Sequence, residues 1–243
     1  MRLASLCLLP IALATTAIGC GSEGATQVPL YALPFKAADG KLQVFDGSKF
    51  EPLFIKGMNI GVGLPGTQPG ELAPTEDDYD RWFAMLSELG INSIRVYTLH
   101  YPRFYKRLHH WNVTHPSKPL YVFHGIWLDE ENHSLNLRDM QSGYDDNIVE
   151  SVDCVHGNNY VFERKGRAHG EYDTDISPWV IGWIIGREVF PDEVQTTTAV
   201  PDRRSSYRGA HVSLPNGTET EVWWAERIDK VIAYEASRYG VYR

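Results

Sequence analysis

The segment VIGWIIGREV, residues 180–189, is an apolar run in which no charged side chain occurs before Arg187. Such a run, rich in β-branched residues, is typical of a strand that is buried on both faces of a parallel sheet. A single carboxylic acid, Glu188, stands at its end. In an α/β barrel the strands carry the catalytic groups to their C-terminal ends, so Glu188 is a candidate for one of them. The alternative is an acid that caps or ion-pairs at the rim of a sheet, because ion-paired carboxylates also occur for structural reasons.

Strand and helix patterns alternate along the rest of the chain. The predicted strands cover residues 53–61, 91–97, 120–127 and 180–189, and the predicted helices cover residues 75–89, 102–111, 146–156 and 221–239. This alternation predicts a parallel α/β fold. A doubly wound sheet is the competitor, but no Gly-x-Gly-x-x-Gly follows the first strand, so dinucleotide binding has no support. The sequence therefore favours the (β/α)8 TIM-barrel type, with about four βα units present. Two Asp-Gly turns, at residues 39–40 and 46–47, predict a short N-terminal β-hairpin that closes the bottom of the barrel.

The first 20 residues have the pattern of an export signal. One positive charge, a short apolar core and a small-residue exit describe a secretory signal, and the core is too short to span a bilayer. The ending Ala17-Ile18-Gly19-Cys20 resembles a bacterial lipobox, which implies that Cys20 becomes the acylated first residue of the mature protein. The alternative is an ordinary signal peptide that is cleaved nearby. Residues 21–33, small, polar and punctuated by proline, predict a tether to the domain at residues 34–243. We therefore expect an exported protein of the cell envelope, anchored to a bacterial membrane through lipid.

Composition narrows the class of ligand. The net charge is −8 and no block of Lys or Arg occurs, which argues against nucleic acid or an anionic membrane surface. Cys154 is the only cysteine after Cys20, so a disulfide framework within the chain is excluded and the domain depends on its core. Aromatic residues make up 12% of the chain and suit sugar faces as well as protein cores. The cluster of His109, His110 and His115 lacks the further ligands of a metal site, so neither a metal nor a cofactor is predicted.

Three segments carry a resemblance to a known clan: EPLFIKGMN at residues 51–59, LGINSIRVY at residues 89–97 and GWIIGRE at residues 182–188. In order and spacing they resemble the (β/α)8-barrel retaining glycoside hydrolases, nearest to the family-2 type catalytic barrel and the β-1,3-glucanosyltransferases. The resemblance extends over about residues 45 to 243. It implies that Glu188 is a general acid/base, which protonates the glycosidic oxygen and then deprotonates water or an acceptor hydroxyl. It also implies a β-linked polysaccharide as the substrate.

Further candidate binding residues lie near the ends of the second and third predicted strands. Arg95 matches an arginine that the clan holds near its nucleophile, and the alternative is a guanidinium that satisfies strand-end carbonyls. Plausible sugar-binding residues, each of which has packing as the alternative, are Tyr97, His100, His124 and Trp127. A polar loop at residues 196–216 is expected over the active-site face.

The sequence departs from the clan in two respects. Arg187 stands where the clan has an asparagine that binds a sugar hydroxyl, so it is a candidate substrate-binding residue whose charge would favour the ionised form of Glu188. The second departure is that a barrel has eight strands and ~250 residues, whereas the pattern supplies four strands. The clan's nucleophile on the seventh strand has no counterpart, and the chain is interpreted as the N-terminal half of a barrel in a truncated form.

Retaining hydrolysis needs two carboxyl groups. The acidic residues that flank the last two predicted strands are usually only solvated in such loops; they are Asp129, Glu130, Glu131, Glu171, Asp173 and Asp175. We therefore expect a glycoside hydrolase or transglycosylase with Glu188 as its acid/base. The alternative is an inactive carbohydrate-binding or envelope-structural lipoprotein. A half-barrel also leaves two sheet edges and an apolar face open, which would favour self-association.

Overall fold

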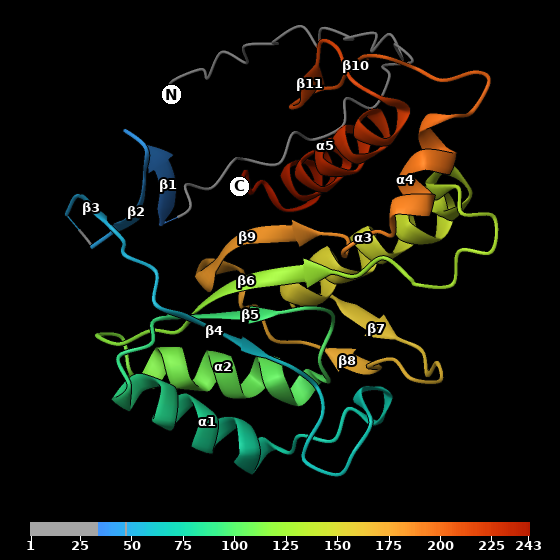
Figure 1. The fold of residues 1–243 in the computed structure, drawn as a ribbon. Helices are drawn as coiled ribbons and strands as arrows, with labels where there is room; N and C mark the ends of the chain where they lie inside the picture. The colour runs from blue at the N-terminus through green and yellow to red at the C-terminus, as the bar shows by residue number, and fades with distance from the viewer. Residues whose placement is uncertain (1–33, 47) are drawn as a thin grey trace, which may run out of the picture.

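The computed structural model describes residues 34–46 and 48–243 of the protein (Figure 1). The predicted signal, the lipid site at Cys20 and the tether lie outside these residues. None of the helices in the described part is long and apolar enough to cross a membrane. The α-helices are α1 (Glu76–Glu88), α2 (Pro102–Thr114), α3 (Gln141–Val155), α4 (Pro191–Thr198) and α5 (Glu219–Tyr239). Short 3₁₀ turns are η1 (Pro69–Glu71), η2 (Leu137–Met140) and η3 (Ser177–Trp179).

The central element is a four-stranded parallel sheet in the order β4-β5-β6-β9. Its strands are β4 (Gly57–Ile60), β5 (Ser93–Val96), β6 (Tyr121–Ile126) and β9 (Val180–Ile185). The order follows the chain without a reversal, in contrast to a doubly wound sheet. The predicted parallel α/β organisation is therefore confirmed, with all four predicted strands in place. Closure into an eight-stranded barrel stays a prediction.

One face of this sheet carries the helices. Ile94 and Val96 of β5 and Val122 of β6 lie in one buried cluster with side chains of α1, α2 and α3. Ile126 of β6 packs with side chains of α3 and α5 in a second cluster. Alternate residues of a strand point to opposite faces, so Arg95 and Phe123 lie on the other face, where they are only half-buried. Helices on a single face are the arrangement of a barrel wall, since a doubly wound sheet has helices on both faces.

A three-stranded antiparallel sheet precedes the central sheet. It consists of β1 (Phe35–Ala38), β2 (Lys41–Phe45) and β3 (Phe50–Pro52). The Phe35 ring packs in a T-shaped pair with Tyr121 at the start of β6, with 5.0 Å between ring centroids. The predicted hairpin is therefore present with one additional strand, and it lies at the end of the sheet where the parallel strands begin (Figure 1).

Several short elements outside the central sheet were not predicted. They are α4 and two antiparallel ribbons, β7 (Asn159–Val161) with β8 (Gly170–Tyr172) and β10 (Tyr207–Arg208) with β11 (Ser213–Leu214). Strands of two or three residues are too short for alternation to be read from the sequence. The predicted loop at 196–216 thus begins inside α4 and contains the β10–β11 ribbon. Helix α3 also begins earlier than predicted, because η2 leads directly into it.

Capping boxes mark the N-termini of α1 and α5. The hydroxyl of Thr75 accepts a hydrogen bond from the backbone N–H of Asp78, whose carboxylate accepts in return from the N–H of Thr75. Thr218 and Glu221 form the same capping box at the start of α5, and Gly240 ends that helix with φ = +68°. Each such N-cap typically stabilises its helix by about 1 kcal/mol.

Candidate functional site

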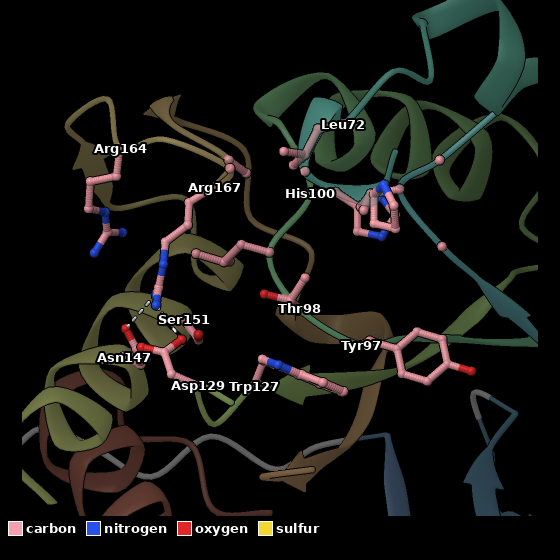
Figure 2. Close-up of a pocket in the computed structure, with 18 of the residues that line it drawn as sticks. Leu72, Tyr97, Thr98, His100, Trp127, Asp129, Asn147, Ser151, Arg164 and Arg167 are labelled. Atoms are coloured by element: carbon pink, nitrogen blue, oxygen red, sulfur yellow. Dashed lines mark hydrogen bonds and ion pairs between the residues drawn. The ribbon is translucent and has the colours of Figure 1, made fainter. Parts of the chain in front are cut away.

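A pocket of about 550 Å³ opens at the carboxyl ends of β4, β5 and β6 (Figure 2). Tyr97 and Trp127, which directly follow β5 and β6, contribute its aromatic surface, and α3 contributes Asn147 and Ser151. The loop between β7 and β8 closes another side with two arginines, Arg164 and Arg167. The pocket therefore combines an aromatic surface with polar and charged groups from three separate parts of the chain.

Two ion pairs tie the β7–β8 loop to the rest of the pocket. Arg167 pairs with Asp129, which follows β6, and also donates a hydrogen bond of 3.2 Å to the amide oxygen of Asn147 (Figure 2). Arg164 pairs with Glu150 of α3. These side chains are between one-fifth and one-half exposed, and such ion pairs contribute roughly 0–1 kcal/mol each. A polar ligand can therefore compete for these groups at little cost.

Three of the predicted binding residues are brought together. The rings of Tyr97 and Trp127 meet edge to face with their centroids 6.3 Å apart. The guanidinium of Arg95 lies over the Tyr97 ring at 4.5 Å, and its buried Nε has no hydrogen-bond partner in the described residues. Arg95 does not line the pocket and contacts it only through the Tyr97 ring.

His100 forms part of the pocket wall although its side chain is buried. Its Nδ1 lies 2.7 Å from the hydroxyl of Tyr79, and its buried Nε2 has no partner within the described part of the chain. Burial lowers the pKa of His100 to about 3, and the neighbouring His124 contributes in the same direction. The imidazole is therefore neutral at physiological pH.

His124 lies on the helix-bearing face of β6, away from the pocket. Its Nε2 is 2.8 Å from the hydroxyl of Tyr105, its Nδ1 is 3.0 Å from the carbonyl of Gly125, and the side chain is fully buried. Burial lowers the pKa of His124 to about 4. We therefore no longer propose it as a substrate-binding residue.

These two histidines predict a pH-dependent stability. The ordinary pKa of histidine is about 6.5, so below pH 6.5 the unfolded chain binds protons that folded His100 and His124 exclude. The free energy of unfolding should therefore fall as pH drops from about 6.5 toward 4, by up to about 1.4 kcal/mol per pH unit for each histidine. Urea unfolding at pH 7, 6 and 5 measures this slope. His124→Gln should reduce the slope by the contribution of one histidine, which is up to about 1.4 kcal/mol per pH unit. Equal stability at pH 7 and pH 5 would contradict the burial of both imidazoles.

Arg187 is a buried structural residue. Its side chain is 2% exposed and pairs with Glu193, which is 1% exposed, through two hydrogen bonds of 2.9 Å. The remaining N–H groups donate to the carbonyl of Asp129 at 3.1 and 3.2 Å and to the carbonyl of Glu188 at 2.9 Å. All five N–H groups of the guanidinium are thus engaged. We therefore no longer propose that Arg187 binds substrate, and its charge is directed at Glu193 instead of the Glu188 carboxylate.

Glu193 was not predicted from the sequence as a residue of the site. Burial by itself would raise the pKa of Glu193, but hydrogen bonds from Arg187, from Asn132 and from the backbone N–H of Phe190 outweigh burial and hold it below its ordinary value. The ion pair is therefore charged on both sides at neutral pH. It joins the loop after β6 to the loop after β9.

Glu188 lies at the carboxyl end of β9 with an exposed side chain. Its carboxylate makes no hydrogen bond or ion pair with another described residue, and it does not line the pocket. Gly186, at φ = +84°, turns the chain just before it, and a Cβ at this glycine would lie 2.2 Å from the Trp224 ring. The turn therefore requires glycine, and it leaves the Glu188 carboxylate free at the edge of the sheet where the pocket opens.

No group of three or more His, Cys, Asp or Glu side chains in the described ranges is arranged to hold a metal ion. The His109 ring packs on Trp179 and the His115 ring stacks on Trp111, so these two histidines do not face one another. No protein-family model, curated protein or solved structure matches the chain. The resemblance to glycoside hydrolases therefore stays a prediction from the sequence, and a function has to be argued from the site itself.

Proposed function

We propose that this protein is a glycoside hydrolase or transglycosylase of the (β/α)8 type. It binds and cleaves a β-linked oligo- or polysaccharide at the carboxyl ends of its parallel strands. The observation that carries the proposal is the position of Glu188, an exposed carboxyl group that pairs with no other described residue and follows the last of four parallel strands. The carboxyl ends of parallel strands are where α/β enzymes place their catalytic groups. Proton donation to a glycosidic oxygen is the task that a single free carboxyl group performs in glycoside cleavage.

The pocket on the same edge supports a saccharide ligand. Its volume of about 550 Å³ falls in the range of small-molecule sites. Tyr97 and Trp127 present apolar ring surface, which suits the C–H faces of a sugar, and Asn147 and Ser151 present groups that hydrogen-bond hydroxyls. The two exposed ion pairs of the β7–β8 loop add donors and acceptors that a hydroxyl-rich ligand can reach.

One observation favours the alternative, a carbohydrate-binding protein without catalysis. Glu188 does not line the pocket, although its backbone is joined to that of Asp129 through Arg187. Saccharide binding in the pocket and bond cleavage at Glu188 are therefore separable in this structure. A saccharide bound in the pocket has to extend toward β9 for its glycosidic oxygen to reach Glu188.

Saccharide binding tests the pocket directly. We expect Trp127→Ala to weaken binding of β-linked oligosaccharides by about fivefold, since the loss of one stacked aromatic side chain removes about 1 kcal/mol. Calorimetric titration of the wild type with β-1,3- and β-1,4-linked oligosaccharides measures the affinity. Phe54→Ala is the matched control. Phe54 is an aromatic residue that is 78% exposed, and it precedes β4 at the amino ends of the parallel strands. Equal affinities of wild type and Trp127→Ala, or no binding by the wild type, would reject this pocket as the saccharide site.

A further inference from the structure

We propose that a second cavity, of about 740 Å³, is a further saccharide subsite beside the 550 Å³ pocket. The ligand is then a chain of several uncharged sugar units that fills both cavities. The inference rests on the proposed function, because it extends the ligand of the same site. Five residues line both cavities, which therefore adjoin each other. The shared residues are Trp127, Asp129, Glu130, Asn147 and Arg167.

The second cavity lies between the loop that follows β6 and the start of α3. Met140 at the end of η2 and Gly143 and Tyr144 of α3 form one wall. The hydroxyl of Tyr144 donates a hydrogen bond of 2.8 Å to the carbonyl of Ile126, and its ring stacks on Trp223. Tyr144 is therefore held in place in the folded protein. A ligand that contacts a wall fixed in advance loses less free energy to ordering.

The two cavities meet at a group of three side chains. Arg167 reaches from the β7–β8 loop to the carboxylate of Asp129 and to the amide oxygen of Asn147 (Figure 2). The side chains of Arg167 and Asp129 are 35% and 50% exposed, and an ion pair with such exposure contributes little to stability. A saccharide chain that passes from one cavity to the other can therefore displace this pair at little cost.

Polar groups in the second cavity are free to bind hydroxyls. The amide nitrogen of Asn147 and the ammonium group of Lys165 donate to no described residue. The carboxylates of Glu131 and Asp139 accept no hydrogen bond from a described residue. A sugar hydroxyl both donates and accepts, so it can use either kind of group. Trp127 adds apolar ring surface at the border of the two cavities, which suits the C–H face of a sugar.

The charges around the two cavities argue against an anionic chain. Together the cavities are lined by five carboxylates and three cations. Since like charges in contact are strongly unfavourable, this excess disfavours uronic acids and sulfated sugars. An uncharged chain meets no such repulsion. The carboxylates are those of Asp129, Glu130, Glu131, Asp139 and Glu150, and the cations are Arg164, Lys165 and Arg167.

The dependence of affinity on chain length tests the second subsite. The full chain is titrated calorimetrically with β-1,3- and β-1,4-linked glucose oligomers of two to six units. We expect the hexamer to bind at least about tenfold more tightly than the dimer. A ligand that reaches the second cavity adds contacts without a second loss of translational freedom. A carboxymethylated hexamer should bind at least about tenfold more weakly than the uncharged one.

Gly143→Leu occupies part of the second cavity without disturbing the fold. A Cβ at this helical glycine meets no atom within 4 Å, and leucine is a better helix former than glycine. We expect the variant to lose the gain in affinity of the hexamer, to bind the dimer as wild type does, and to have an unchanged or higher Tm. Ser142→Leu is the matched control, because Ser142 is the exposed preceding residue and lines neither cavity.

The outcomes separate this inference from the proposed function. If the dimer binds but the hexamer binds no more tightly, or if Gly143→Leu binds the hexamer like wild type, the second subsite is rejected and the proposed function stands. If no oligomer binds, both are rejected. Equal losses of Gly143→Leu on dimer and hexamer would place the short ligand in the second cavity and contradict the assignment. Equal affinity for the carboxymethylated hexamer would reject the uncharged chain as the ligand.

Discussion

Glu188→Gln is expected to lower kcat for an unactivated β-linked oligosaccharide by about 10²- to 10⁴-fold, the usual contribution of a general acid. The amide has nearly the same shape but has no acidic proton to give to the leaving oxygen. For a dinitrophenyl β-glycoside the loss in the first step should be much smaller, since this leaving group departs without protonation. Steady-state kinetics on the two substrates measure the difference.

The control for this prediction is Glu88→Gln. Glu88 is an exposed glutamate at the end of α1, on a different part of the molecule, and its substitution should leave both rates unchanged. A Glu188→Gln protein with full activity on the oligosaccharide would remove Glu188 from the mechanism. An equal loss of kcat/KM, which reports the first step, on both substrates would assign it a role other than proton donation.

Arg187→Met should lower the free energy of unfolding by about 3–5 kcal/mol, because it leaves Glu193 as a buried charge without its partner. The same substitution releases the carbonyls of Asp129 and Glu188 from their shared donor. For a protein of this size the expected fall in Tm is about 10 °C. Urea unfolding and thermal melting measure both quantities.

A surface ion pair provides the matched control. Arg81 pairs with Asp78 but is 62% exposed, so Arg81→Met should change stability by less than about 1 kcal/mol. Replacing both buried partners, as in Arg187→Met with Glu193→Leu, should recover part of the loss, since no unpaired charge is left. Equal effects of Arg187→Met and Arg81→Met would show that the buried pair does not hold the two loops.

The parallel sheet could be predicted because its signals are local. The apolar run at residues 180–185 and the threonine cap of α1 are each contained in a few neighbouring residues. By contrast, α4 has eight residues, and the β7–β8 ribbon has three residues in each strand. Elements of that length form because of what they contact, so their sequences carry little periodic signal.

The site was predictable only where it depends on strand ends. Tyr97 and Trp127 follow β5 and β6 directly and do meet at the pocket. His124 lies on the opposite face because side chains alternate along a strand, and it shares the parity of the core residues Val122 and Ile126. That parity could have been read from the sequence.

The remaining features of the site depend on tertiary contacts. Arg164 and Arg167 reach the pocket from a loop about 40 residues after Trp127, and no local sequence pattern predicts their position in the pocket. The sequence around Arg187 does not distinguish an arginine that faces solvent from one that pairs with the buried Glu193. Asp129 was interpreted as part of a solvated acidic loop, whereas its carboxylate pairs with Arg167 in the wall of the pocket.

Proton NMR of the first product formed from a β-linked oligosaccharide tests the central claim most directly. Spectra recorded before mutarotation distinguish the two anomers at the new reducing end. The account predicts that the β-anomer appears first in wild type and that its formation depends on Glu188. The α-anomer as first product would contradict a retaining mechanism, and no product at all would contradict glycoside cleavage by this protein.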